Sequence, residues 1–596
     1  MGLKVTVRPK KALSADTKRP IANKGSSAPT QALITPSGRF MALDTDKLRG
    51  GYYTPAPVAR WLAEWAIRSA DERILEPSCG DGNLIIASME VLASLGATSD
   101  AIGRQVSGVE LTTEEAAKAR NRAAAFGDHC SEAVVVDDFF GWFERRSQRS
   151  DSGHLYDVAI GNPPFIRYQS FPEPARTRAM SLMSAAGLKP NKLTNVWVPF
   201  VVAAVQSLRK GGRLAFVIPA ELLQVTYAAQ LRKLLTQRFD SITLVSCNEL
   251  FFEGAEQEVL LLLAEGARAK ADTETACQVR LVERKTVADV VATTPRGIAN
   301  GVDDKAVCGD SEKWLKYFLT ASEIQFMREL RLSQVATTLS HFASVDVGVV
   351  TGKNKFFVLS QADLRSLNIE GCFLKLASRS AHLRGAIFSE SDWQKLYDAD
   401  ERVALLNIRS DMNKLTESQT SYISDGERHG YHLGYKCSIR SPWYHVPSIW
   451  TPDGFLFRQI YDFPRFIRND AHACSTDTIH RLTVHGCTAD ALISSAYTYM
   501  TAASAEIEGR SYGGGVLELE PTEAERLLVP ANVDHALPLT EMDSLLRHHG
   551  VDDLLRLNSH KVLTEGLGLS RADVKRAESI WIKMRDRRRD RGRRAR

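Results

Sequence analysis

The chain of 596 residues is 44% hydrophobic and 25% charged, so it can form the cores of more than one domain. Its nine cysteines include no Cys-x-x-Cys pair. This argues against a disulfide framework or a structural zinc site, and we expect no metal. No apolar run reaches the roughly 18 residues of a membrane-spanning helix, so we exclude a membrane protein and expect a soluble, cytoplasmic one.

The net charge of +5 is unevenly distributed. Residues 1–50 carry ten Lys and Arg against three acids, and residues 585–596 carry eight Arg against two Asp, which leaves −8 on the residues between them. The basic ends are expected to increase salt-dependent, non-specific attraction to nucleic acid. Residues 1–45 are rich in Lys, Pro, Ser and Thr without apolar periodicity, which predicts a flexible basic arm and no signal peptide.

A glycine loop follows the first predicted strand, within residues 73–86. Gly80 and Gly82 permit a tight turn, and the apolar residues after them predict a helix. The Gly-Asp-Gly spacing differs from the dinucleotide fingerprint, and an acid at this place would repel a pyrophosphate. Glu76 and Asp81 suit a ligand with positive charge instead.

Two further predicted strands end in side chains that could bind a nucleoside. Residues 106–110 end in Glu110, at the usual position of a carboxylate that binds ribose hydroxyls. The apolar residues from 134 lead to Asp138 and Phe139, which are placed to meet an adenine ring. Each group has another explanation as a strand or helix cap. Three in succession favour a nucleoside site.

A fourth strand ends in Asn162-Pro163-Pro164-Phe165. Two prolines cannot continue a strand ladder, so the chain must turn stiffly at the sheet edge where ligands bind. The Asn162 side-chain oxygen and the Pro163 carbonyl can accept both hydrogens of a planar amino group, and Phe165 can stack on its ring. Alone, the tetrapeptide also fits an ordinary strand-ending turn.

These motifs resemble those of amino-methylating DNA methyltransferases of the TaqI type, the gamma class. The resemblance covers most of residues 50–530 and implies S-adenosylmethionine as cofactor and a base amino group in double-stranded DNA as target. The residues that it implies for cofactor binding are Tyr53, Thr54, Glu76, Ser78, Gly80, Gly82, Glu110, Asp138 and Phe139.

The same resemblance implies a catalytic role for Asn162, Pro163, Pro164 and Phe165. Phe165 stands where many relatives carry tyrosine, so stacking remains and a hydroxyl is absent. Phe252 is expected to stack on the other side of the turned-out base. Phe251 is the fallback, because the spacing to the next apolar strand differs by about one residue from the family pattern.

The second half resembles the family's recognition region. Lys353 and Lys355 lie in a glycine-opened loop, and Arg510 and Tyr512 precede three glycines; we expect all four to contact DNA. Hairpin turns with solvated charges are the other reading. Residues 455–466 interleave arginine with aromatic residues, which fits a nucleic-acid surface or a core beneath a basic rim.

The expected fold is α/β: a doubly wound, Rossmann-like class I methyltransferase domain followed by an irregular α+β DNA-recognition domain. Residues 166–195 read as a long polar loop beside the catalytic turn. The predicted parts are a flexible arm (1–45), the catalytic domain (46–265), a connector with a helix at 321–332 (266–340), the target recognition domain (341–540), C-terminal helices (541–584) and an Arg-rich tail (585–596).

The resemblance implies site-specific methylation of adenine N6 by a bacterial or archaeal modification enzyme, with a separately encoded restriction endonuclease as a further expected partner. Cytosine N4 remains an alternative target, since both are amino groups on planar rings. A catalytically silent DNA-binding subunit is an alternative from another class. Glu283-Arg-Lys285 matches half of a nuclease motif, but no Pro-Asp partner lies at a sensible distance upstream. The recognised DNA sequence cannot be read from these residues.

Overall fold

The computed structural model describes residues 53–148, 155–191, 194–249, 251, 258–369, 371–408, 415–512 and 515–594. The predicted N-terminal arm and Phe252 lie outside these ranges. No helix in the described ranges is long and apolar enough to cross a membrane.

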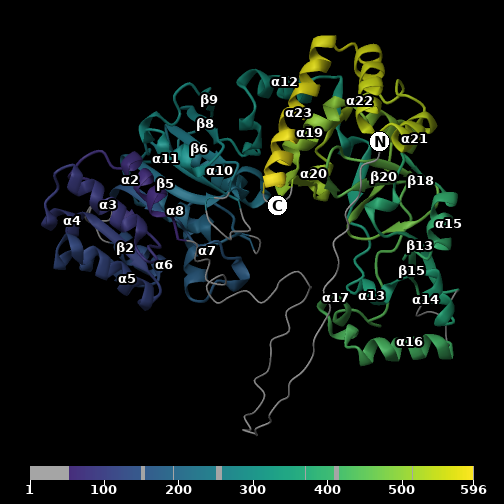
Figure 1. Cartoon of the computed structure of the whole chain (residues 1–596), viewed down its shortest axis with the longest axis horizontal. Helices are drawn as coiled ribbons and strands as arrows, with labels where there is room; N and C mark the ends of the chain where they lie inside the picture. The colour runs from purple at the N-terminus through teal and green to yellow at the C-terminus, as the bar shows by residue number, and fades with distance from the viewer. Residues whose placement is uncertain are drawn as a thin grey trace, which may run out of the picture. The chain divides into compact units, whose positions relative to one another are not determined.

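A nine-stranded sheet organises the first part of the chain (Figure 1). Its spatial order is β3-β2-β1-β4-β5-β7-β6-β8-β9, and the pairs from β3 to β5 are all parallel. Strand β7 is antiparallel to both of its neighbours. The strands are β1 (Ile74–Glu76), β2 (Val106–Glu110), β3 (Val134–Val136), β4 (Tyr156–Gly161), β5 (Leu208–Pro219), β6 (Ser241–Cys247), β7 (Val259–Glu265), β8 (Cys277–Arg284) and β9 (Lys305–Val307).

Helices cover both faces of this sheet. Apolar side chains of α2, α3 and α5 form one core with it, and those of α6, α7, α8 and α10 pack on the other side. Every residue of β4 is buried, as expected for a central strand covered twice. The doubly wound prediction is confirmed. The helices are α2 (Ala56–Ala66), α3 (Asn83–Ser94), α4 (Ser99–Gln105), α5 (Thr113–Ala123), α6 (Phe139–Ser147), α7 (Ala175–Ala185), α8 (Trp197–Ser207), α9 (Glu221–Gln224), α10 (Ala229–Arg238) and α11 (Val287–Ala292).

Residues 166–195 differ from the predicted polar loop, because they contain α7. Ala175, Ala179 and Met183 are buried on one side of this helix. Their spacing of four residues places them on one helical face, and they pack into cores shared with α8. Small side chains gave this amphipathic pattern too little contrast to be recognised.

The second part of the chain is the irregular α+β region that was predicted. Its strands form sheets of five, four, three and two strands. They are β10 (Ala336–Thr338), β11 (Ala343–Asp346), β12 (Val358–Leu359), β13 (Phe373–Ala377), β14 (Ile387–Phe388), β15 (Ala404–Leu406), β16 (Gly454–Phe457), β17 (Gln459–Ile460), β18 (Phe466–Asn469), β19 (Cys474–Ser475), β20 (Ile479–Val484), β21 (Arg510–Tyr512), β22 (Val516–Glu518) and β23 (Leu528–Pro530).

Helix α12 (Ala321–Leu332) has the bounds that the sequence predicts. A capping box between Thr320 and Glu323 starts it. The remaining helices are α13 (Asn354–Phe357), α14 (Gln361–Ser366), α15 (Glu390–Asp398), α16 (Glu417–Arg428), α17 (Tyr435–Ser438), α18 (Ala489–Ala496), α19 (Tyr499–Glu508), α20 (Pro521–Ala524), α21 (Leu539–His548), α22 (Val551–Ser559) and α23 (Arg571–Arg594).

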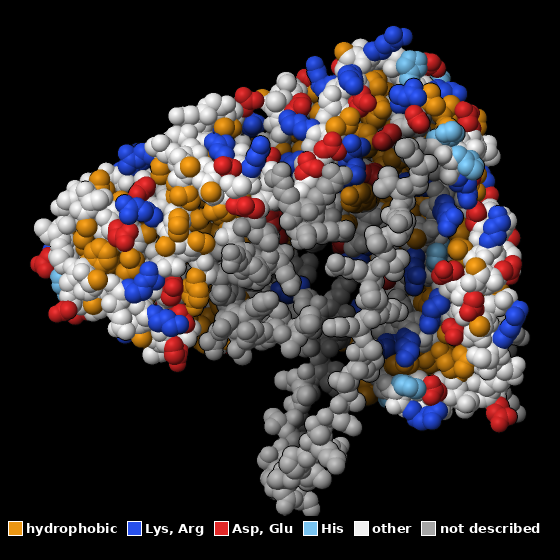
Figure 2. Space-filling view, viewed as in Figure 1, with side chains coloured by type: hydrophobic (Ala, Val, Ile, Leu, Met, Phe, Trp, Pro, Cys, Tyr) orange, Lys and Arg blue, Asp and Glu red, His pale blue; other side chains and the backbone are white. Residues whose placement is uncertain are grey.

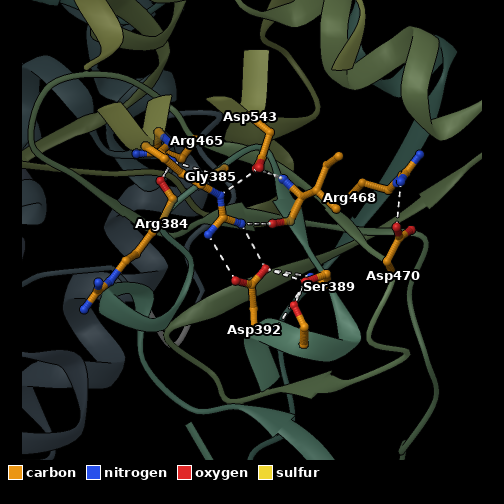
Figure 3. A network of polar contacts seen from close by, with 11 residues as sticks. Arg384, Gly385, Ser389, Asp392, Arg465, Arg468, Asp470 and Asp543 are labelled. Carbon is orange, nitrogen blue, oxygen red and sulfur yellow. Dashed lines mark hydrogen bonds and ion pairs between the residues drawn. The ribbon is translucent and has the colours of Figure 1, made fainter. Parts of the chain in front are cut away.

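The arginine and aromatic residues of 455–466 are structural. Phe455, Phe463 and Phe466 are buried, while Arg465 donates hydrogen bonds to the carbonyls of Arg384 and Gly385 at 2.7 and 2.9 Å (Figure 3). This segment is therefore a core with a rim of paired arginines.

The C-terminal helices differ from the prediction at both ends. Helix α21 begins at Leu539, and α23 continues to Arg594, through most of the predicted tail. Arg588 lies beside the buried Glu506 of α19 at 2.6 Å, and Arg587 pairs with Glu283 at 2.7 Å. Two arginines of the predicted tail, Arg587 and Arg588, are thus paired with acidic residues of the protein.

Replacing Arg588 by alanine is expected to lower the free energy of unfolding by about 3–5 kcal/mol, because Glu506 would remain buried without its partner. Arg588 also donates to the carbonyls of Gly515 and Tyr461. Urea unfolding followed by circular dichroism measures the change. Arg556→Ala, which removes an exposed pair with Asp553, is the control and should behave as wild type. Equal effects of both variants would contradict the role of the buried pair.

Candidate active site

A cavity of about 790 Å³ lies at the carboxyl ends of the first four strands. Carboxyl ends of parallel strands meet at one edge of a sheet, which explains why separate motifs line one space. The predicted residues that line it are Tyr53, Thr54, Glu76, Ser78, Gly80, Glu110, Asp138, Phe139, Asn162 and Pro164. Gly82, Pro163 and Phe165 are not among its lining residues.

The glycine loop requires both glycines for different reasons. Gly80 has φ +51°, and a Cβ there would lie 2.9 Å from Tyr53 Cε1. Gly82 has φ +91°, and its Cβ would lie 2.9 Å from the Cβ of Ala119 on α5. Such φ values strain other residues. The absence of a side chain at Gly80 therefore leaves room for the Tyr53 ring. Its absence at Gly82 allows α5 to approach the loop.

Glu76 is a buried carboxyl group in the wall of the cavity. Its side chain is 2% exposed, and its Oε2 has no hydrogen-bond partner within the described residues. Burial raises the pKa of Glu76 well above the ordinary carboxyl value, and the nearby Asp81 and Glu110 raise it further. Thr54 Oγ1 is also buried without a partner. Two unpartnered oxygens on lining residues suit a ligand that donates hydrogen bonds and carries positive charge.

Glu110 accepts hydrogen bonds from residues that follow two neighbouring strands, β1 and β2. Its Oε2 accepts from the amide of Gly80, and its Oε1 accepts from the amide of Thr112, both at 2.9 Å. A carboxylate oxygen can accept more than one hydrogen bond. Glu110 thus fixes the loop and keeps acceptor capacity toward the cavity that it lines.

Asp138 and Phe139 serve the fold as well as the cavity. Asp138 caps α6 through the amides of Phe140 and Gly141 and accepts from Arg178 at 3.0 Å. The Phe139 ring stacks on Phe200 with centroids 5.2 Å apart. Their predicted contact with an adenine ring stays a prediction.

The Asn162 turn is held against the glycine loop. Ser78 Oγ donates to the Asn162 carbonyl at 3.4 Å, and Asn162 itself lines the cavity. Phe165 is half-buried and packs against the two cores on either side of the sheet. The fallback residue Phe251 is 5% exposed within a core, a position that leaves its ring little surface for stacking on a ligand.

The sequence analysis missed several lining residues. Phe171 and Pro172 come from the segment before α7, and Phe200 lies in the apolar run of α8. Nothing local marks them as site residues, since their patterns are those of a loop and a core helix. Leu111, 62% exposed, follows Glu110 directly, and its position after a strand end was the available signal.

The predicted DNA contacts have different surroundings in the structure. The Lys353 ammonium is 5.0 Å from the centre of the Tyr431 ring, and Lys355 lines a second cavity of about 270 Å³. Arg510 instead donates to the buried Glu523 at 2.8 Å, as a structural ion pair would. The side chain of Tyr512 lies outside the described residues. All four assignments stay predictions.

Two family models match the chain in succession. Residues 39–294 match the N-6 DNA Methylase family, and residues 311–563 match the C-terminal domain of Type II methyltransferase M.Eco57I. Neither match determines the class, so membership of the gamma class stays a prediction.

Named relatives are similar over most of the chain. Type II methyltransferase M.AccI from Acinetobacter calcoaceticus is 22% identical, covering 82% of this chain and 86% of its own. Type II methyltransferase M.XamI from Xanthomonas campestris pv. amaranthicola is 24% identical, covering 81% and 85%.

Solved structures are more distant. The type IIG restriction endonuclease BpuSI has a TM-score of 0.39 at 12% identity, over 91% of this chain and 66% of its own. The type I enzyme M protein M.EcoKI has a TM-score of 0.32 at 16% identity, over 42% and 54%. From the two family matches and the named relatives, the chain belongs to the type II DNA methyltransferases that carry an N-6 DNA methylase domain.

Proposed function

We propose that this chain binds S-adenosylmethionine in the 790 Å³ cavity and methylates N6 of an adenine turned out of double-stranded DNA. The observation that carries the proposal is the meeting of Asn162 with Glu76, Glu110 and Asp138 in one cavity. The modification half of a restriction–modification system is the biological role we propose, because the named relatives are type II methyltransferases. A separately encoded endonuclease is the partner that this role implies.

The cavity residues fit the cofactor. Glu76 Oε2 and Thr54 Oγ1 are buried acceptors without partners, which suits the ammonium of a methionyl group. Glu110 keeps acceptor capacity for ribose hydroxyls. When bound, S-adenosylmethionine supplies an electrophilic methyl group on a sulfonium. Burial of Glu76 strengthens its attraction for such a cation.

The Asn162 turn supplies the chemistry on the protein side. An exocyclic amino nitrogen is a poor nucleophile because its lone pair is delocalised into the ring. Asn162 Oδ1 and the Pro163 carbonyl would accept the two amino hydrogens and localise the lone pair on nitrogen. No strong base is needed, since the proton leaves a nitrogen that has become cationic.

Base turning has an energetic cost that aromatic contacts reduce. Removing a base from the stack costs a few kcal/mol. Stacking on an aromatic side chain recovers roughly 1–3 kcal/mol per base. Phe165 is the described residue that we propose for this contact, and Phe252 is its proposed counterpart.

Two other functions, cytosine N4 methylation and DNA binding without catalysis, are less favoured than adenine N6 methylation. The Asn-Pro-Pro-Phe turn alone does not separate adenine N6 from cytosine N4, but the N-6 methylase match favours adenine. A silent DNA-binding subunit would not need Asn162, Glu76 and Glu110 together in one cavity.

Incubation with radiolabelled S-adenosylmethionine and unmethylated bacterial DNA is expected to place the label on N6-methyladenine, identified by mass after digestion to nucleosides. RNA of matched length serves as the control and should stay unlabelled. Label on cytosine N4 would overturn the target assignment. Absence of label on DNA despite cofactor binding would overturn the proposed activity.

A further inference from the structure

Residues 428–452 form a segment of 25 residues without Asp or Glu. It contains three Lys or Arg, three His and five Tyr or Trp. Basic and aromatic residues in alternation fit nucleic acid when the side chains are exposed. Figure 2 shows hydrophobic, basic, acidic and histidine side chains next to one another near the part of the chain labelled α16 in Figure 1 (lower right).

Three apolar side chains of this segment project into solvent. Leu433 is 71% exposed, Tyr435 62% and Ile439 64%. Of the large hydrophobic side chains in the described ranges, only Leu332 is more exposed than Leu433. A single exposed apolar residue is ordinary, but three within seven residues indicate an interaction site.

Contacts with neighbouring residues fix the segment 428–452. The three exposed side chains therefore do not lie on a loosely attached loop. Arg440 donates to the carbonyls of Val350 and Thr351, both at 2.7 Å. Cys437 is fully buried between the exposed residues. Gly352 has φ +83°, and a Cβ there would lie 2.8 Å from the Cβ of Lys436. The loop that carries Gly352 and Lys353 therefore packs closely against residue 436 of the segment.

Basic side chains line a cavity that Ile439 also lines. This cavity of about 500 Å³ is lined by Lys436, Arg440, His445 and Arg481. A second cavity, of about 270 Å³, is lined by Lys355, Arg379 and Arg402. No acidic residue is among the described residues that line either one. The two cavities are therefore complementary to phosphates, whereas Arg428 and His429 at the start of the segment pair with Asp425.

We propose that Leu433, Tyr435 and Ile439 form a wedge that inserts between base pairs of double-stranded DNA while the basic side chains that line the two cavities contact the phosphates. Apolar side chains that enter a base step unstack it and bend the duplex. A locally unstacked duplex releases a base more readily. The wedge thus rests on the proposed function, since it assists the turning of the target base toward the Asn162 cavity.

The test compares Leu433→Ser/Tyr435→Ser/Ile439→Ser with a matched control, Leu95→Ser/Leu332→Ser/Leu557→Ser, whose residues are also exposed. Anisotropy of a fluorescent duplex that wild type binds, with the methylation site included where one has been mapped, measures affinity over a salt series. We expect at least ten-fold weaker binding by the wedge variant, with the salt slope unchanged because no phosphate contact is removed. The control should bind as wild type, and both variants should keep the wild-type melting temperature.

Affinity of the wedge variant within two-fold of wild type would overturn the proposal. So would light scattering that shows a wild-type dimer which the variant dissolves, since the patch would then join two copies. The Asn162→Ala variant separates the two proposals, because it should bind the duplex normally without methylating it. If wild type binds the duplex but transfers no methyl group, the proposed function fails while the wedge is still judged from binding. Failure of wild type to bind any duplex would overturn both.

Discussion

Replacement of Asn162 by alanine is expected to lower the turnover number by about 10²–10³-fold and to leave cofactor affinity within about two-fold of wild type. The size follows from the loss of one preorganised hydrogen-bonding group at a reacting centre. Asn162 lines the cavity at the end of β4, and its proposed contact is with the amino group of the base. A contact that localises the lone pair acts on the chemical step.

Single-turnover methyl transfer at saturating DNA measures the chemical step, and calorimetry with S-adenosylmethionine measures binding. Asn83→Ala is the matched control from the same cavity. Asn83 donates to the Thr54 carbonyl at 2.9 Å, so its loss should weaken cofactor binding more than the chemical step. Equal losses of turnover and cofactor affinity in Asn162→Ala would contradict the assigned role.

Replacement of Glu76 by glutamine is expected to weaken cofactor binding by at least roughly 30-fold, about 2 kcal/mol. Glu76 is nearly fully buried with one unpartnered oxygen. Neutralising it removes the buried negative charge that we propose for the cofactor's ammonium. The expected change in the dissociation constant is measured by calorimetry. An unchanged dissociation constant would show that the ammonium binds elsewhere.

The raised pKa of Glu76 predicts two pH dependences of opposite sign. Burial, followed by the charges of Asp81 and Glu110, makes the folded protein without cofactor hold a proton on Glu76 at pH values where the unfolded chain has lost it. Stability therefore falls as pH rises above the ordinary carboxyl range toward the raised pKa. Cofactor affinity rises over the same interval, because a cationic ligand binds the ionised form and expels the proton.

The glutamine variant provides the control for these dependences. Melting temperatures of the protein without cofactor and dissociation constants, each measured against pH, should lose their Glu76 component in Glu76→Gln. Identical pH profiles for wild type and variant would show that Glu76 does not titrate in the way its burial indicates.

Local patterns were sufficient for several elements. The strand at residues 106–110 and the helix at 321–332 have the predicted bounds. The first depends on an apolar run with an acidic end; in the second, the structure adds a capping box between Thr320 and Glu323 that fixes the start of the helix. Helix α7 was missed because its buried face consists largely of alanine. Its packing against α6 and α8 decides that it is helical, and no local signal reports that contact.

The pairing of charged side chains was the feature that the sequence predicted least well. Arg510, expected at DNA, pairs with Glu523, and the tail residue Arg588 pairs with Glu506. Each pair joins residues from different elements of the fold. A count of charges along the chain cannot distinguish such an internal pair from a free surface cation, because pairing depends on distance in space.

The sequence by itself determined that side chains at or just after four predicted strand ends, among them Glu76, Glu110, Asp138 and Asn162, would lie at one cavity. In a parallel sheet, successive strands present their ends at one edge, so residues after β1, β2, β3 and β4 had to meet. Only the tertiary structure decided that Glu76 is buried with an unpartnered oxygen and that Leu433, Tyr435 and Ile439 are exposed. Burial and exposure depend on which distant elements pack against a residue, and that information is not local to the chain.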